Sequence, residues 1–263
     1  MLDPKEHTPL EARGLGLSFG SHSVLKDFNL TIPKGQISVV IGPNACGKST
    51  LLRSLARLEK PNAGTVLLDG KSIHKQPTRE VAKRLGILPQ MPVAPEGITV
   101  GDLVSRGRTP HQSVWRQWSR QDEVAIQNAM DMTKVTELRD KPFSSLSGGQ
   151  RQRVWIAMAL AQETDLLLLD EPTTFLDLAH QIELLELLKR CNGDQQMTIV
   201  AVLHDINLAA RYAHHLIVMK DGQIEAQGNA AKVITQDIMK STFGLECYVM
   251  PDPVKGTPLV VPA

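Results

Sequence analysis

The most constraining feature of the sequence is a nine-residue stretch between two apolar runs, Gly42-Pro43-Asn44-Ala45-Cys46-Gly47-Lys48-Ser49-Thr50. The run before it, 37–41, has the length of a buried strand, and the run after it, 51–58, favours a helix. Strand, glycine-bounded loop and helix form the setting in which the pattern G-x-x-x-x-G-K-[ST] binds phosphate. A chance match in a chain of this length is on the order of one per cent.

The chemistry of phosphate binding explains the residue types in this loop. Gly42 and Gly47 permit a tight turn whose backbone N–H groups surround phosphate oxygens. The helix that follows directs its positive end at the anion. Lys48 is placed to reach the β- and γ-phosphates of a nucleotide, and Ser49 to ligate Mg²⁺. The alternative, a strand-to-helix turn with a helix-capping serine, fits the flanking runs less well.

Length and charge narrow the class of protein. A chain of 263 residues with 42% hydrophobic residues can form one large α/β domain with a small inserted lobe. A net charge of +1 gives no general attraction to nucleic acid or anionic lipid. Three cysteines without C-x-x-C spacing argue against a disulfide framework or a zinc site and suit a reducing cytosol. We find no signal-peptide or membrane-spanning run, so we expect any membrane role to require a partner.

A second polar cluster follows the apolar run 166–169, which has the composition of a strand buried on both faces. Asp170 and Glu171 end this strand, and residues at the carboxyl ends of parallel strands gather at one sheet edge. We expect Asp170 to hold Mg²⁺ and Glu171 to polarise the attacking water. The alternative is that the two acids only begin a turn.

Two further polar residues follow apolar strands. Gln90 comes after the run 85–88 and is placed to reach metal or water, although a lone glutamine is commonly a surface residue. His204 comes after the run 197–203 and is placed to contact the γ-phosphate, although a lone histidine is commonly packed or exposed without function. Phe19 ends a predicted strand in a hairpin within 13–32, and it either stacks on an adenine ring or packs in the core.

The string Leu146-Ser147-Gly148-Gly149-Gln150 precedes a strongly helical segment, 151–162. It therefore predicts a second helix end that favours an anion, with Ser147 as cap or phosphate donor. A simple helix cap is the alternative.

The segment 91–120 precedes this string, and its prolines and glycines break up regular structure. Within it, arginines alternate with tryptophans. A protein-partner surface, a solvated loop and a nucleic-acid patch remain open, and the near-neutral charge disfavours the last. The residues of this surface are Arg106, Arg108, Trp115, Arg116, Trp118 and Arg120.

Taken in order, these features resemble the ATP-binding-cassette family over nearly the full length. The matching positions are Phe19 (A-loop), 42–50 (Walker A), Gln90 (Q-loop), Ser147, Gly148, Gly149 and Gln150 (signature), Asp170 and Glu171 (Walker B and catalytic glutamate), Asp177 (D-loop) and His204 (switch histidine). The resemblance implies a P-loop NTPase with a RecA-like core and an antiparallel β subdomain, 1–90 plus 163–263, and an inserted helical subdomain, 91–162. It implies ATP and Mg²⁺ as cofactors, with Ser49, Gln90 and Asp170 around the metal.

The family resemblance also implies partners. A symmetric pair of subunits would enclose two ATP, so that Ser147 to Gln150 and Asp177 meet the partner's nucleotide. Such a pair would work under a transmembrane permease, with a substrate-binding protein as an indirect partner, at the cytoplasmic face of the inner membrane. Ala45 stands where the family usually has glycine, and a left-handed backbone there would cost on the order of 1 kcal/mol. Phe19 replaces the more frequent tyrosine.

Three stretches are similar to the ATPases of ferric-siderophore importers, especially the enterobactin type. They are Arg106-Gly107-Arg108-Thr109-Pro110-His111-Gln112, Leu160-Ala161-Gln162-Glu163-Thr164 and the tail 252–262. This similarity implies import of an iron(III)–siderophore complex. Haem or cobalamin import by the same engine is the alternative. A non-transport cassette ATPase acting on nucleic acid is disfavoured, because the chain has neither a coiled-coil insert nor a second cassette.

Overall fold

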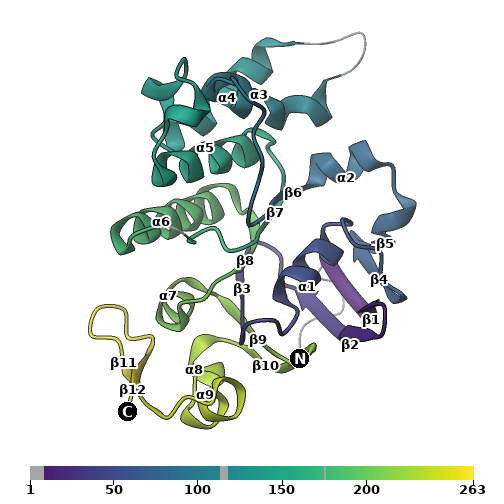
Figure 1. Cartoon of the computed structure of the whole chain (residues 1–263), viewed down its shortest axis with the longest axis vertical. Coiled ribbons are helices and arrows are strands. Elements are labelled where there is room, and N and C mark those ends of the chain that lie inside the picture. Colours follow the sequence, from purple (N-terminus) through teal and green to yellow (C-terminus); the bar gives the residue numbers. More distant parts are fainter. Residues whose placement is uncertain (1–8, 113–117, 175) are drawn as a thin grey trace.

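The computed structural model describes residues 9–112, 118–174 and 176–263, and a six-stranded sheet lies at its centre (Figure 1). Across the sheet the strands are β10 (Gln223–Gly228), β9 (His215–Lys220), β3 (Ile37–Ile41), β8 (Thr198–Val202), β7 (Leu166–Leu169) and β6 (Leu85–Leu88). All neighbouring pairs are parallel except β10 with β9. The predicted strand-loop-helix unit is confirmed, because β3 leads through residues 42–47 into α1 (Lys48–Leu55).

A second, antiparallel sheet covers α1. Its strands, in spatial order, are β2 (His22–Ile32), β1 (Leu10–Phe19), β4 (Ala63–Leu68) and β5 (Lys71–Ser72). Leu51 and Leu52 of α1 pack with Phe28 of this sheet and with Val40 and Ile217 of the central sheet in one buried cluster. The hairpin predicted within 13–32 is therefore confirmed, and α1 lies between the two sheets.

The opposite face of the central sheet is covered by helices. Val39 and Ile41 of β3 alternate with Val40 and point into a second buried cluster, as the period of two along a strand requires. This cluster also holds residues of the helical lobe, which contains α3 (Val100–Ser105), α4 (Arg120–Met132) and α5 (Gly148–Ala161), and of α6 (Leu178–Gln195) and α7 (Ile206–Tyr212). Consequently α1 and α5 pack on opposite faces of the central sheet.

The segment 91–120 contains more helix than its prolines and glycines indicate. Thr99 caps α3 by accepting a hydrogen bond from the backbone N–H of Asp102, and α3 runs directly into the 3₁₀ segment η2 (Arg106–His111). Gly107 is required in η2, because a Cβ there would lie 2.2 Å from the carbonyl oxygen of Met158 in α5. Gly101 and Pro110 therefore lie within these short helices and Gly107 at a close contact, whereas the earlier breakers precede α3.

Arg108 does not belong to a partner surface, which corrects the prediction made from the sequence. It is 4% exposed, its Nε donates to Asp122 Oδ1 at 2.9 Å, and its Nη1 donates to Glu163 Oε2 and to the Ala161 carbonyl oxygen, both at 2.7 Å. A guanidinium can satisfy a carboxylate and a helix-terminal carbonyl together, so it binds η2 to α4 and to the end of α5. Arg106, Trp118 and Arg120 are exposed, whereas Trp115 and Arg116 lie outside the described residues.

The tail, residues 227–263, was not assigned from the sequence and forms two short helices and a hairpin. The Asn207 side chain of α7 donates to the Val260 carbonyl oxygen at 3.1 Å and accepts from the Val260 N–H at 2.7 Å, so the hairpin is held against α7. No helix in the described ranges is long and apolar enough to cross a membrane. The remaining elements are α2 (Thr78–Arg84), α8 (Ala230–Val233), α9 (Gln236–Phe243), β11 (Cys247–Pro251), β12 (Pro258–Pro262) and the 3₁₀ turns η1 (Ile73–Lys75), η3 (Thr136–Leu138) and η4 (Phe143–Ser145).

Candidate nucleotide site

The phosphate loop is shaped by close backbone contacts. At Gly42 a Cβ would lie 2.3 Å from the Met219 carbonyl oxygen, and Gly47 has φ 102° with Val24 pressed against it. Neither position therefore admits a side chain. Lys48 is 5% exposed, and its Nζ donates to the carbonyl oxygens of Gly42 and Pro43 at 2.8 Å each. The ammonium group thus lies over the loop, where a phosphate chain would meet it.

The two unusual residues of the loop behave differently. Ala45 has φ 61°, so the position does need the left-handed conformation and its Cβ carries a cost of about 1 kcal/mol. Cys46 is buried, and burial raises the pKa of its thiol. Because the thiolate is the reactive form, we expect the Cys46 thiol to react slowly with alkylating reagents.

Two of the residues predicted around Mg²⁺, Ser49 and Asp170, meet at the start of α1, whereas the third, Gln90, donates its side-chain amide to Glu171 instead. Ser49 Oγ donates to Asp170 Oδ1 at 3.0 Å, and burial raises the pKa of Asp170 although that hydrogen bond opposes the shift. A buried carboxylate beside a hydroxyl fits a hard cation that takes its other ligands from phosphates and water. The described residues contain no group of three His, Cys, Asp or Glu side chains suited to a metal.

The structure brings three predicted residues together around one carboxylate. Glu171, at the end of β7, lies 2.7 Å through Oε1 from Nε2 of His204, which follows β8. Its Oε2 accepts from the side-chain amide of Gln90, which follows β6. Glu171 has φ 51°, and a left-handed residue held at a functional site is a place where folds store strain. Neighbouring parallel strands thus deliver all three side chains to one edge.

Sequence reasoning missed two residues that support this edge. Thr174 Oγ1 donates to Glu171 Oε2 at 3.2 Å, and Gln152 of α5 donates to the Pro172 carbonyl oxygen at 2.8 Å. A threonine three residues after the glutamate is a local signal of a side-chain-supported turn. No local signal exists for Gln152, because it reaches the turn from another helix.

The signature residues form a capped helix end next to the D-loop. Ser147 and Gln150 complete a reciprocal capping box at the start of α5, so Ser147 caps this helix as the simple-cap interpretation predicts. Gly149 faces Leu176 and His180, and Asp177 caps α6. Hydrogen bonds from the backbone and side chain of His180 lower the pKa of the Asp177 carboxyl. This helix end remains available for an anion, but it belongs to the face opposite α1.

Phe19 is 53% exposed at the end of β1, so its interpretation as a core aromatic is wrong. An exposed ring at a strand end, close in sequence to the hairpin that precedes the phosphate loop, has a free face. Stacking on a nucleotide base stays a prediction.

The chain is similar to known proteins in sequence and in fold. The family model described as "ABC transporter" matches residues 25–174. The chain is 57% identical over 248 residues to the probable siderophore transport system ATP-binding protein YusV of Bacillus subtilis (strain 168), covering 94% of this chain and 90% of the relative. It is 50% identical over 253 residues to the ferric enterobactin transport ATP-binding protein FepC of Escherichia coli (strain K12), covering 96% and 93%. The dimeric structure of MJ0796, a bacterial ABC transporter cassette, superposes with a TM-score of 0.75 at 28% identity, covering 84% of this chain and 98% of that one. The chain therefore belongs to the ABC transporter family, as one of its ATP-hydrolysing subunits.

Proposed function

We propose that two copies of this ATPase enclose two ATP molecules and drive a permease that imports an iron(III)–siderophore complex. The observation that carries the enzymatic part is the convergence of Gln90 and His204 on Glu171, beside the Ser49–Asp170 contact. A carboxylate oriented by two partners next to a phosphate loop is suited to polarise an attacking water.

The position of the two helix ends supports the proposed dimer. Lys48 begins α1 and Ser147 caps α5, and these helices pack on opposite faces of the central sheet. One copy is therefore poorly placed to surround a nucleotide with both ends. A two-fold pair supplies Lys48 from one copy and Ser147 from the other at each of two identical sites. The signature residues 147–150 and Asp177 would then face the partner's ATP.

In this proposal each of the remaining site residues has its own role in nucleotide binding or hydrolysis. Residues 42–50 bind the phosphates, Phe19 stacks on the adenine, and His204 contacts the γ-phosphate. Mg²⁺, when bound by Ser49, Gln90 and Asp170, neutralises charge on the phosphates. Contacts to the γ-phosphate favour the closed pair, and hydrolysis removes them, so the pair opens. The opening moves the permease through residues near Gln90 to Trp118, at the cytoplasmic face of the inner membrane, and a substrate-binding protein delivers the cargo outside.

An uptake measurement tests this function. We expect Glu171→Gln, introduced into the chromosomal copy, to reduce uptake of radiolabelled iron–siderophore to background, because the water loses its polarising carboxylate. The purified variant should keep ATP affinity within about twofold and lose hydrolysis by about 10²-fold or more.

Glu225→Gln is the matched control, since Glu225 is an exposed glutamate on β10. It should leave both measurements unchanged. Near-normal ATP turnover in Glu171→Gln would overturn the role of Glu171. If Glu171→Gln loses haem or cobalamin uptake but keeps normal iron–siderophore uptake, the siderophore assignment is overturned and the ATPase mechanism is not.

A further inference from the structure

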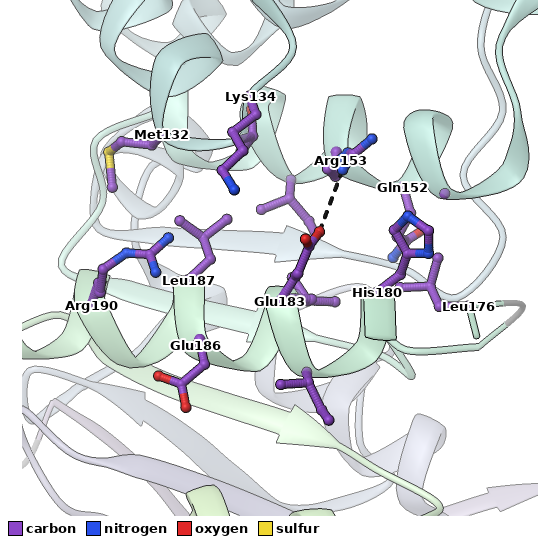
Figure 2. A pocket seen from close by; sticks show the side chains of 15 residues that line it. Met132, Lys134, Gln152, Arg153, Leu176, His180, Glu183, Glu186, Leu187 and Arg190 are labelled. Carbon is purple, nitrogen blue, oxygen red and sulfur yellow. Dashed lines mark ion pairs between the residues drawn. The ribbon is translucent and has the colours of Figure 1, made fainter. Parts of the chain in front are cut away.

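A cavity of about 200 Å³ lies between the helical lobe and α6, apart from the phosphate loop (Figure 2). Its walls come from the end of α4, from one side of α5 and from α6. Met132, Ile156 and Leu187 give it an apolar lining. None of its lining residues belongs to the phosphate loop or to the Glu171 cluster, although Gly149 and His180 close one end.

Two cations from different parts of the fold face this space. Lys134 follows α4 and Arg190 lies near the end of α6, and Figure 2 shows both charged tips directed toward the space above Leu187. Both residues are exposed, and neither is paired with a carboxylate within the described part of the chain. Two cations that share a cavity repel each other mildly, so an anion between them would be favoured.

The acids of the same walls are already engaged. Glu183 Oε2 lies 3.5 Å from Arg153 Nη1, and Figure 2 shows its carboxylate turned toward that guanidinium. Glu186 accepts a hydrogen bond of 3.0 Å from the Tyr212 hydroxyl and points away from the cavity. The Nε of Arg153 is buried and has no hydrogen-bond partner within the described part of the chain. The cavity thus has hydrogen-bond donors on its cationic side chains that no carboxylate of its walls satisfies.

We propose that this cavity binds a small amphipathic anion, a carboxylate carried on a single ring or a short chain. The carboxylate lies between Lys134 and Arg190, and the apolar body lies on Met132, Ile156 and Leu187. The size fits, because a cavity of about 150 Å³ already holds a benzene ring. Apolar walls with a few placed polar groups are the usual composition of a small-molecule site.

Such a ligand would tie the helical lobe to α6. Lys134 and Arg153 belong to the lobe, whereas Arg190 and Glu183 belong to α6, and Gly149 of the signature lies at the cavity's end. A ligand that contacts both walls favours the spacing found here over any other spacing of the two parts. ATP turnover requires the signature to move toward a nucleotide, so occupancy lowers the ATPase rate. This last step rests on the proposed function, whereas the binding itself does not.

The binding test uses phenylacetate as the probe and the full chain observed by NMR titration. We expect a Kd on the order of millimolar, as for a fragment of about ten heavy atoms. Phenylacetamide keeps the ring without the charge, and acetate keeps the charge without the ring. Both should bind about tenfold more weakly, since each lacks one half of the recognition.

The variant test pairs Arg190→Gln with Lys189→Gln, a neighbouring exposed cation that does not line the cavity. Arg190→Gln should weaken phenylacetate binding about tenfold and Lys189→Gln should leave it unchanged, with equal unfolding midpoints. Saturating phenylacetate should lower the ATPase rate of the wild type and not of Arg190→Gln. Equal affinity for phenylacetamide, or full affinity in Arg190→Gln, would overturn the site. Binding with an unchanged ATPase rate would overturn the coupling and leave the proposed function untouched.

Discussion

At the scale of single residues, the nucleotide site combines places where a side chain is impossible with places where one is strained. A Cβ at Gly42 would clash with the Met219 carbonyl oxygen, and Gly47 has a φ of 102°, so both positions favour glycine. Ala45 and Glu171 keep side chains at φ 61° and φ 51°. At Glu171 the strained backbone aims the carboxylate between Gln90 and His204. The Ala45 side chain is a single methyl group without a polar atom, which makes this residue the cleaner one to test.

Replacement of Ala45 by glycine should stabilise the protein. The left-handed backbone costs alanine about 1–2 kcal/mol, and glycine's extra freedom in the unfolded chain returns part of that, which leaves a gain of about 0.5–1 kcal/mol. Urea unfolding of the nucleotide-free protein measures the difference. Ala125→Gly, inside α4 at ordinary helical geometry, is the matched control and should destabilise by about 1 kcal/mol. A loss of stability in Ala45→Gly would contradict the strain argument.

Residues of the site were predictable where the loop or strand that carries them also dictates their position. Asp170, Glu171 and His204 follow buried strands, and the carboxyl ends of neighbouring parallel strands must meet. Gln152 was not predictable, because it reaches the Pro172 carbonyl oxygen from α5 and only the packing of the lobe places it there. The cavity at Arg190 was equally hidden, since its walls come from three separate helices.

At the scale of elements, two of the stretches that resemble siderophore importers, 106–112 and 160–164, pack against each other. Arg108 of η2 contacts Ala161 and Glu163 at the end of α5, and His111 lies 2.8 Å through Nε2 from the Gln162 carbonyl oxygen. The sequence pattern misplaced Arg108 because a buried, paired arginine and an exposed one look alike in a list of charges. The packing of Gly107 against α5 decides which of them it is.

Removal of the Arg108 side chain should lower the free energy of unfolding at neutral pH. Arg108→Met leaves Asp122 buried without its cation, which costs about 3–5 kcal/mol, whereas Arg13→Met at an exposed pair should cost less than about 1 kcal/mol. Denaturant unfolding of the two variants measures both. Equal losses of stability in the two variants would contradict a structural role for the buried Arg108–Asp122 pair.

The same pair predicts a pH dependence. Burial alone would raise the pKa of Asp122, yet hydrogen bonds from Ser119 and Arg108 outweigh it and hold the pKa below its ordinary value of 3.8. A carboxyl with a depressed pKa in the folded state stabilises the fold above its unfolded pKa and loses that contribution as the pH falls through the folded value. The difference in stability between wild type and Arg108→Met should therefore be full at pH 7 and shrink below about pH 4. A difference that stays constant down to pH 3 would contradict this assignment.

At the scale of the whole molecule, the order of motifs along the chain predicted the class of fold but not how its parts face one another. That α1 and α5 lie on opposite faces of the sheet follows from the alternation of Val39, Val40 and Ile41 between two cores, which becomes visible only once the helices are placed. The C-terminal hairpin was unpredicted for a similar reason, because its position depends on Asn207 and Arg211 of α7. In the proposed function, this arrangement gives each copy two half-sites for a nucleotide.

The central claim is that each ATP is shared between two copies, and sedimentation velocity with ATP tests it most directly. The hydrolysis-deficient variant Glu171→Gln should sediment as a dimer with ATP and as a monomer without it. Glu171→Gln combined with Ser147→Arg should bind ATP with the same affinity and remain a monomer, because the arginine blocks the partner's phosphate site. If the double variant forms the dimer as readily as Glu171→Gln, Ser147 does not meet the partner's nucleotide, and the shared site is contradicted.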